Sequence, residues 1–309
     1  MSRSITVVVS THRSPGPDQQ ELHAQLVAAL EKQQDFDWVV IPHLYDLEPF
    51  GPAVRHLQSV GGDLVVLAWL HARPAYWVLD ALGVRGRWGN PLPRPETQVA
   101  DPALADPRRA AIPDRTLWCF DLAAHNRPEP YLEALAHIVA GSAPGRATPN
   151  AEVGSSHGRL KIIQESTRPR WYPVVDLDQC ANCKQCLNFC LFGVYGLDEK
   201  GYVVVEQPEA CRPGCPACAR ICPHHAIMFP QHADPGIAGD PSAPRQPFAA
   251  PGLPIVPDHA LALLAAQDAN PAGTGTERPP ATSCAQAEEG GASSSDLDAL
   301  VERLDALEL

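Results

Sequence analysis

The sequence predicts an α/β domain with a doubly wound parallel sheet, then a small α+β unit rich in cysteine, and finally a disordered tail. The α/β domain is predicted because short, continuous apolar runs alternate with amphipathic segments over residues 4–141, which is typical of strands buried on both faces. The small unit is predicted because eight of the ten cysteines lie between positions 180 and 222. Cysteines at intervals of two and three residues suit metal binding better than disulfide bonds.

The first domain is expected to span residues 1–141. Its strands are predicted at residues 5–10, 38–41, 64–69 and 117–122, and its helices near residues 19–32, 52–60, 74–82 and 130–140. Right-handed crossovers between these strands give a parallel, flavodoxin-like sheet. A segment rich in proline and charge, residues 85–115, is predicted to form a long loop before the last strand.

Composition divides the rest of the chain. Residues 142–156, rich in small residues and proline, are expected to form a linker, and a second folded unit is expected over residues 157–230, beginning with a strand at 160–164. Residues 231–293 are predicted to be a disordered linker because they are rich in proline, alanine and glycine. Residues 294–309 are predicted to form an amphipathic helix, whose apolar stripe either docks in a groove or stays frayed.

The cysteines form two runs of similar spacing. The first run is C-x2-C-x2-C-x3-C, and the second repeats it with one extra residue in its first interval. In such a run a tight loop wraps three thiolates around one iron–sulfur cluster, and the fourth thiolate binds the neighbouring cluster. The eight cysteines are Cys180, Cys183, Cys186 and Cys190 in the first run and Cys211, Cys215, Cys218 and Cys222 in the second.

With these motifs, residues 171–230 resemble the bacterial-type two-cluster ferredoxins, whereas no family is recognised for the N-terminal domain. The resemblance implies a small ferredoxin-like fold that holds two 4Fe-4S clusters. It assigns one cluster to Cys180, Cys183, Cys186 and Cys222, and the other to Cys190, Cys211, Cys215 and Cys218. The chain departs from the family pattern at Leu191, where a proline is usual, and at residues 212–214, where two residues are usual. The alternative is zinc, which also takes four thiolates but usually in paired C-x2-C knuckles.

Each predicted strand of the first domain is followed by a histidine: His12, His43, His71 and His125. Ligands of open α/β sheets bind at the carboxyl ends of the strands, so these histidines are candidate metal or proton-transfer groups. The doubly wound shape with histidines at the strand ends also resembles the chelatases that insert metal into tetrapyrroles. The alternative is that these are ordinary histidines in polar loops.

A flavin such as FMN is the other candidate ligand of the first domain. Residues 10–14 supply hydroxyls and amides at a helix start, where phosphate binds well, and Trp69, Tyr76 and Trp77 are candidates to stack on a flavin ring. Against this, Pro15 and Pro17 remove amide donors. Neither G-x-G-x-x-G nor G-x-x-x-x-G-K-[ST] occurs, which argues against NAD binding and nucleotide hydrolysis.

The sequence therefore favours electron transfer, by a ferredoxin-type carrier or a non-catalytic electron-input subunit of a larger oxidoreductase. The alternative is a redox enzyme whose N-terminal domain binds flavin or a histidine-held metal and receives electrons from the clusters. A net charge of −12 with scattered Lys and Arg argues against nucleic acid as a partner. The apolar runs are far shorter than the ~20 residues that span a bilayer, and no basic segment precedes an apolar core at the N-terminus. We expect a cytoplasmic protein without membrane insertion, whose partner is a redox protein or oxidoreductase complex.

Overall fold

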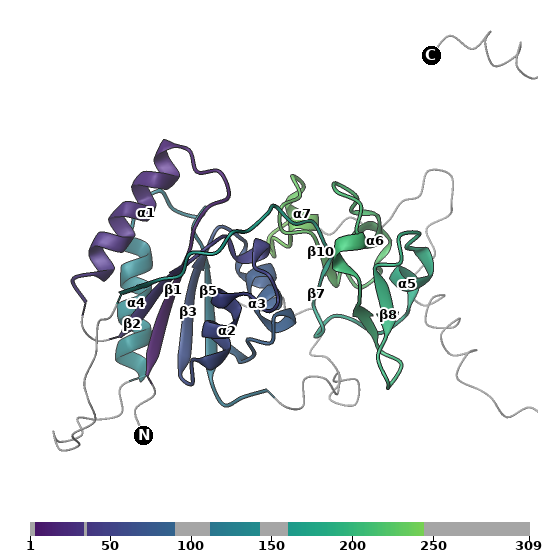
Figure 1. Cartoon of the computed structure of the whole chain (residues 1–309), viewed down its shortest axis with the longest axis horizontal. Coiled ribbons are helices and arrows are strands. Elements are labelled where there is room, and N and C mark those ends of the chain that lie inside the picture. Colours follow the sequence, from purple (N-terminus) through teal and green to yellow (C-terminus); the bar gives the residue numbers. More distant parts are fainter. Residues whose placement is uncertain (1–3, 34–35, 90–111, 143–159, 244–309) are drawn as a thin grey trace, which may run out of the picture. The chain divides into compact units, whose positions relative to one another are not determined.

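The computed structural model describes residues 4–33, 36–89, 112–142 and 160–243 (Figure 1). They form an α/β domain followed by a cysteine-rich module, defined here as residues 174–228, and both belong to one compact unit. The described part of the α/β domain is built on a six-stranded sheet with strand order β4-β5-β3-β1-β2-β6. All the strand pairs in this sheet are parallel, which confirms the predicted α/β class. The strands are β1 (Ile5–Ser10), β2 (Asp37–Ile41), β3 (Asp63–Ala68), β4 (Arg87–Trp88), β5 (Thr116–Asp121) and β6 (Leu160–Ile162).

Helices cover both faces of this sheet, as a buried parallel sheet requires. Figure 1 shows α1 (Pro17–Leu30) and α4 (Glu129–Ser142) on one face, with α2 (Pro52–Ser59) and α3 (Ala72–Ala81) on the other. Neighbouring residues of β1 point to opposite layers, since Val7 and Val9 pack with α1 while Val8 packs with α2 and α3. Continuous apolar strands therefore serve two hydrophobic layers at once.

The predicted strands and helices of this domain all form, with ends that differ by at most two residues. Helices α1 and α2 begin at a proline in the first helical position, where the missing N–H costs nothing. Two strands correct the sequence interpretation. β4 lies within residues 85–115, which were predicted to be a loop. The strand predicted to begin the second unit is β6, which instead pairs with β2 in parallel register at the edge of the first sheet.

The cysteine-rich module consists of short elements around a small core. Its strands β8 (Tyr195–Leu197) and β9 (Val203–Val205) form a hairpin, and a second antiparallel pair joins β7 (Val174–Val175) to β10 (Ile227–Met228). Each half of the module also contains one short helix, α5 (Gln185–Phe189) and α6 (Ala217–Ile221).

The segment after the module corrects a further expectation. Disorder was predicted from residue 231 onward, but residues 235–238 form α7 (Pro235–Ala238), and the Asp234 side chain caps it by accepting a hydrogen bond from the Gly236 amide. Ala238 is buried, and the Phe229 amide donates to the Ile237 carbonyl at 2.8 Å. The predicted terminal helix at 294–309, and the rest of the predicted linkers, lie outside the described residues. Within the described ranges, the helices are all too short or too polar to cross a lipid bilayer.

Candidate metal centres

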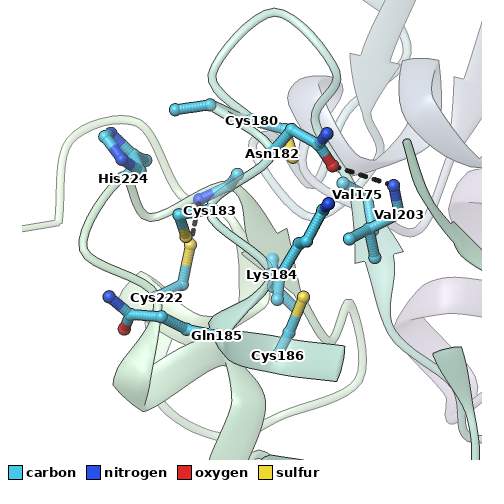
Figure 2. A pocket seen from close by; sticks show the side chains of 13 residues that line it. Val175, Cys180, Asn182, Cys183, Lys184, Gln185, Cys186, Val203, Cys222 and His224 are labelled. Atoms are coloured by element: carbon cyan, nitrogen blue, oxygen red, sulfur yellow. Dashed lines mark hydrogen bonds between the residues drawn. The ribbon is translucent and has the colours of Figure 1, made fainter. Parts of the chain in front are cut away.

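Four of the eight clustered cysteines line one pocket, called here the first pocket. They are Cys180, Cys183, Cys186 and Cys222, which Figure 2 shows with Asn182 and Lys184 between them. Three of these cysteines come from one loop and the start of α5, whereas Cys222 follows α6 at the far end of the module. The folded chain thus gathers the same four cysteines that the sequence resemblance grouped together. Their role as metal ligands stays a prediction.

The loop around the first pocket has an unusual backbone that is fixed from outside. Asn182 and Lys184 have φ values of 54° and 61°, in the left-handed region that non-glycine residues rarely adopt. The Asn182 side chain accepts a hydrogen bond from the Val203 amide at 2.9 Å (Figure 2). It also donates to the Gly201 carbonyl at 3.1 Å. Left-handed residues in such loops turn backbone N–H groups toward a common centre, where they favour an anion. An iron–sulfur cluster with four thiolates suits a concavity of this kind.

The other four cysteines line the second pocket: Cys190, Cys211, Cys215 and Cys218. The two pockets have no lining residue in common among those that the structure describes. The three-residue interval after Cys211 forms a β-turn in which the Cys215 amide donates to the Arg212 carbonyl at 3.1 Å. Pro213 takes the second position of this turn and Gly214, with φ of 77°, takes the third, as a type II turn requires. The extra residue is therefore absorbed by the turn.

The remaining departure from the family pattern concerns Leu191, which follows Cys190 in place of a proline. Leu191 is 92% exposed at the rim of the second pocket. The replacement therefore changes no buried packing. The backbone of Cys215 is held from another side, because Trp171 Nε1 donates to the Cys215 carbonyl at 3.2 Å and the Trp171 ring stacks on Phe229 with 5.2 Å between ring centroids.

Burial governs the protonation of these thiols. It raises the pKa of Cys186, Cys211 and Cys218 to about 12, and neighbouring cysteines add to the effect. Burial also raises the pKa of Cys222, although the Ala226 amide, which donates to its sulfur at 3.3 Å, opposes the shift. Buried thiols gathered in fours are stable as thiolates only when cations compensate them, and iron in a cluster supplies that charge. The donor set of each pocket thus fits a four-iron cluster.

A buried polar network links the α/β domain to the second pocket. The Arg170 side chain is 3% exposed and donates to the Leu47 carbonyl at 2.7 Å and to Glu209 Oε1 at 2.8 Å. Glu209 lies in the turn of 3-10 helix η4 (Pro208–Ala210) that leads into Cys211. The Arg170 amide also donates to Asp46 Oδ1 at 2.9 Å, and Asp46 pairs with Arg13. These residues hold the second cysteine loop against the sheet domain.

Two stacked tyrosines reinforce this link. The rings of Tyr45 and Tyr172 lie 4.3 Å apart between centroids, at an angle of 21°. The Tyr172 amide donates to the Tyr45 hydroxyl at 2.7 Å, and the Tyr172 hydroxyl donates to the Tyr45 carbonyl at 3.1 Å. Both side chains are buried, so the α/β domain and the segment entering the module share one core.

The four sheet-edge histidines do not come together as one site. His12 and His43 are neighbours, with 6.5 Å between ring centroids, and His12 also packs edge-on against Trp69. His71 Nδ1 instead lies 3.0 Å from Asp121 Oδ2, and His125 packs against Tyr131. No set of three or more His, Cys, Asp or Glu side chains within the described residues is arranged to bind a single metal ion.

The candidate flavin groups are engaged elsewhere. The Ser10 hydroxyl donates to the Pro42 carbonyl and accepts from the Leu44 amide, while Arg13 pairs with Asp46. Tyr76 and Trp77 are buried under the sheet, and the Tyr76 hydroxyl donates to the Gly86 carbonyl at 2.7 Å. Two of the three proposed stacking aromatics are thus core residues, which sequence reasoning could not distinguish from ring-binding ones.

Sequence reasoning missed the residues that attach the cysteine loops to the sheet domain, among them Arg73, Arg170 and Asp176. One signal was present in the sequence: charged and aromatic residues are concentrated at 168–176, directly before Cys180. The partners on the sheet domain, in contrast, are more than 100 residues away in the chain.

Comparison with known proteins finds ferredoxins. An uncharacterized ferredoxin of Methanocaldococcus jannaschii is 44% identical over 66 residues, which cover 21% of this chain and 44% of that protein. Ferredoxin-3 of Nostoc sp. is 33% identical over 72 residues, which cover 18% of this chain and 73% of that protein. Pyruvate synthase subunit PorD of M. jannaschii is 34% identical over 55 residues, 18% of this chain and 62% of that protein.

These matches concern only part of each protein. The chain spans less than half the length of the first M. jannaschii relative and less than two thirds of the PorD subunit. No protein-family model matches the chain.

Proposed function

Because the chain belongs to the ferredoxin family, whose members transfer electrons through iron–sulfur clusters, we propose that its cysteine-rich module carries electrons through two 4Fe-4S clusters. The observation that carries this proposal is the division of eight cysteines between two pockets, four to each. The division is crossed, because Cys222 lines the pocket of the first run and Cys190 lines the pocket of the second. Crossed ligation of this kind is what the family resemblance implied.

The ferredoxin-like fold of the module is part of the same proposal. Two short helices and two small antiparallel pairs, arranged as two similar halves, support it. When bound, each cluster spreads one electron over four irons, so that transfer to a partner needs little rearrangement. The chain's own contribution is to supply thiolates, aim backbone N–H groups and exclude water.

We further propose that the chain delivers electrons to a larger oxidoreductase, as a separate carrier or as an input subunit. The similarity to a pyruvate synthase subunit supports this role. The buried links between the α/β domain and the module support it too, because they attach the two pockets to a second folded part that a partner could also contact.

The first experiment is elemental analysis of the full chain purified without oxygen. About eight iron and eight sulfide per chain are expected from two complete cysteine sets. Cys183→Ser should remove mainly the first cluster and leave roughly half the iron, and Cys215→Ser should remove mainly the second. Zinc without sulfide would refute the proposal. Identification of the proteins that co-purify from the native host then tests the role in a complex.

A redox enzyme with a flavin or histidine-held metal in the α/β domain is the second candidate. The adjacency of His12, His43 and Trp69 at the carboxyl edge of the sheet favours it. Flavin fluorescence after acid release, or a stoichiometric metal other than iron, would establish it. An unchanged metal content after the double replacement of His12 and His71 would argue against a metal at these histidines.

A further inference from the structure

We propose that Arg73, on helix α3 of the sheet domain, is a positioning residue for the first pocket and controls how firmly that pocket retains its cluster. This inference rests on the proposed function, since it requires a 4Fe-4S cluster bound by Cys180, Cys183, Cys186 and Cys222. It adds that the module does not build this site alone. A side chain of the sheet domain completes it.

Arg73 binds two loops at the same time. Its Nε donates to Asp176 Oδ2 at 2.7 Å, and its terminal amino group donates to the His225 carbonyl at 2.9 Å. Only the planar guanidinium, with donors at fixed angles, can make both contacts with one side chain. Asp176 precedes Cys180 and His225 follows Cys222, so Arg73 joins the two chain segments that must converge on the first pocket.

Asp176 organises the approach to Cys180. Its Oδ1 accepts hydrogen bonds from the amides of Asp178 and Gln179, at 3.0 and 3.1 Å, and its carbonyl accepts from the Cys180 amide at 3.0 Å. Its own amide donates to the Ala226 carbonyl at 2.7 Å. The Asp176 side chain is only 5% exposed, so its carboxylate needs a partner with positive charge, and Arg73 is that partner.

The other loop carries Cys222 toward the same place. The His225 amide donates to the Cys222 carbonyl at 3.1 Å, and the Ala226 amide donates to the Cys222 sulfur at 3.3 Å. His225 has a φ of 48°, a conformation that a histidine keeps only when its surroundings hold it. The Arg73 bond to the His225 carbonyl is one such constraint. His225 lies three residues after Cys222 and directly before Ala226, whose amide donates to the Cys222 sulfur.

Cys222 is the ligand most in need of this constraint. Three cysteines of the first pocket lie within seven residues of one another, whereas Cys222 is 36 residues beyond Cys186. The chain must close a long loop to bring it in, which costs entropy that local contacts recover. Arg73 thus acts at the one ligand that the first cysteine loop does not itself position.

Replacement of Arg73 should have two separable effects. Arg73→Met removes the link between the loops and leaves the buried Asp176 carboxylate without its cation. We expect iron of the first cluster to pass to a chelator roughly ten- to hundredfold faster, which corresponds to the loss of one or two hydrogen bonds of a charged donor. We also expect a lower reduction potential for that cluster, because an uncompensated negative charge disfavours the reduced, more negative form.

Two further variants separate the link from the charge. Arg73→Lys keeps the positive charge but cannot bind both loops, so it should release iron faster than the native chain with a nearly unchanged potential. The double variant R73M/D176N removes both charges, so its potential should return toward the native value while iron release stays fast. The matched control is Arg87→Met. Arg87 lies on the edge strand β4 and forms an exposed ion pair with Asp114, so this replacement should change neither the rate of iron release nor the reduction potential.

The measurements are made anaerobically on the full chain: iron and sulfide content, time course of chelation, and redox titration followed by electron paramagnetic resonance. Circular dichroism confirms that each variant is folded. Fast release of half the iron in Arg73→Met, with the other half at the native rate, supports the inference. Native release and potential in both Arg73→Met and Arg73→Lys, or equal loosening of both clusters, would overturn it. If the native chain holds no iron and sulfide, the proposed function has failed instead.

Discussion

His43 should make this protein sensitive to mild acid. The side chain is buried at the carboxyl edge of the sheet, with Nδ1 3.5 Å from Asp46 Oδ2 and Nε2 3.4 Å from the Gln231 side chain. Burial lowers its pKa to about 4, and the nearby Arg13 charge adds to this effect while Asp46 opposes it. The perturbation we propose is His43→Gln, which keeps a neutral polar side chain in place of the imidazole.

The magnitude follows from the two pKa values. In the unfolded chain the imidazole titrates near 6.5, so below that pH the unfolded state binds a proton that the folded state does not. Folding stability is therefore lost as the pH falls from 6.5 toward 4. At 1.36 kcal/mol per pKa unit the complete loss is about 3 kcal/mol, of which about 2 kcal/mol falls between pH 7 and pH 5.

The assay is thermal unfolding of the full chain at pH 7 and pH 5, followed by tryptophan fluorescence. For a chain of this size about 2 kcal/mol corresponds to roughly 4–8 °C in Tm, so the native chain should lose that much more than His43→Gln between the two pH values. His137→Gln, an exposed replacement on α4, controls for the removal of a histidine. The reasoning is refuted if the native chain and His43→Gln show the same change in Tm.

Three other predictions follow from the same contacts. Asp46→Asn removes the carboxylate that pairs with the Arg13 side chain and accepts from the Arg170 amide, and should lower the free energy of unfolding by about 3 kcal/mol. Asp114→Asn, in an exposed ion pair, is the control, and equal effects of the two variants would contradict the buried network. Gly214→Ala places a side chain at a φ of 77°, which costs about 1 kcal/mol, and should speed iron loss from the second cluster only. The control Gly141→Ala, in α4, should leave the rate of iron loss unchanged. Deletion of residues 295–309, which lie outside the described residues, should leave iron content intact but weaken electron delivery at low protein concentration; unchanged transfer rates would exclude docking by that segment.

The sequence was most informative where a local pattern has one physical cause. Runs such as Val7 to Val9 are apolar at every position because both faces of the strand are buried, and this separated them from helices. The resemblance of the cysteine runs to two-cluster ferredoxins likewise implied which four thiols share each pocket.

The remaining structure depends on contacts between distant residues, which leave no local pattern. Nothing near Arg73 in the sequence distinguishes it from Arg87, yet one is held in a buried pair with Asp176 and the other in an exposed pair. Strand β7 and helix α7 are too short for periodicity to reveal, and they form because neighbouring segments complete them. The type II turn after Cys211 was not predicted, because the family pattern has only two residues at this point. Pro213 and Gly214 accommodate the extra residue in the turn.

The edge strand β6 affects how this chain could have been assembled from parts. Its three residues pair with β2 and lie between the two folded parts in sequence, only 18 residues before Cys180. A gene fusion that joined a carrier to the sheet domain without β6 would leave β2 as a bare edge, with unpaired backbone groups open to association with other chains. Exchange of the cysteine-rich part between proteins therefore has to leave residues 160–162 with the sheet domain, and the point of recombination falls between β6 and Cys180.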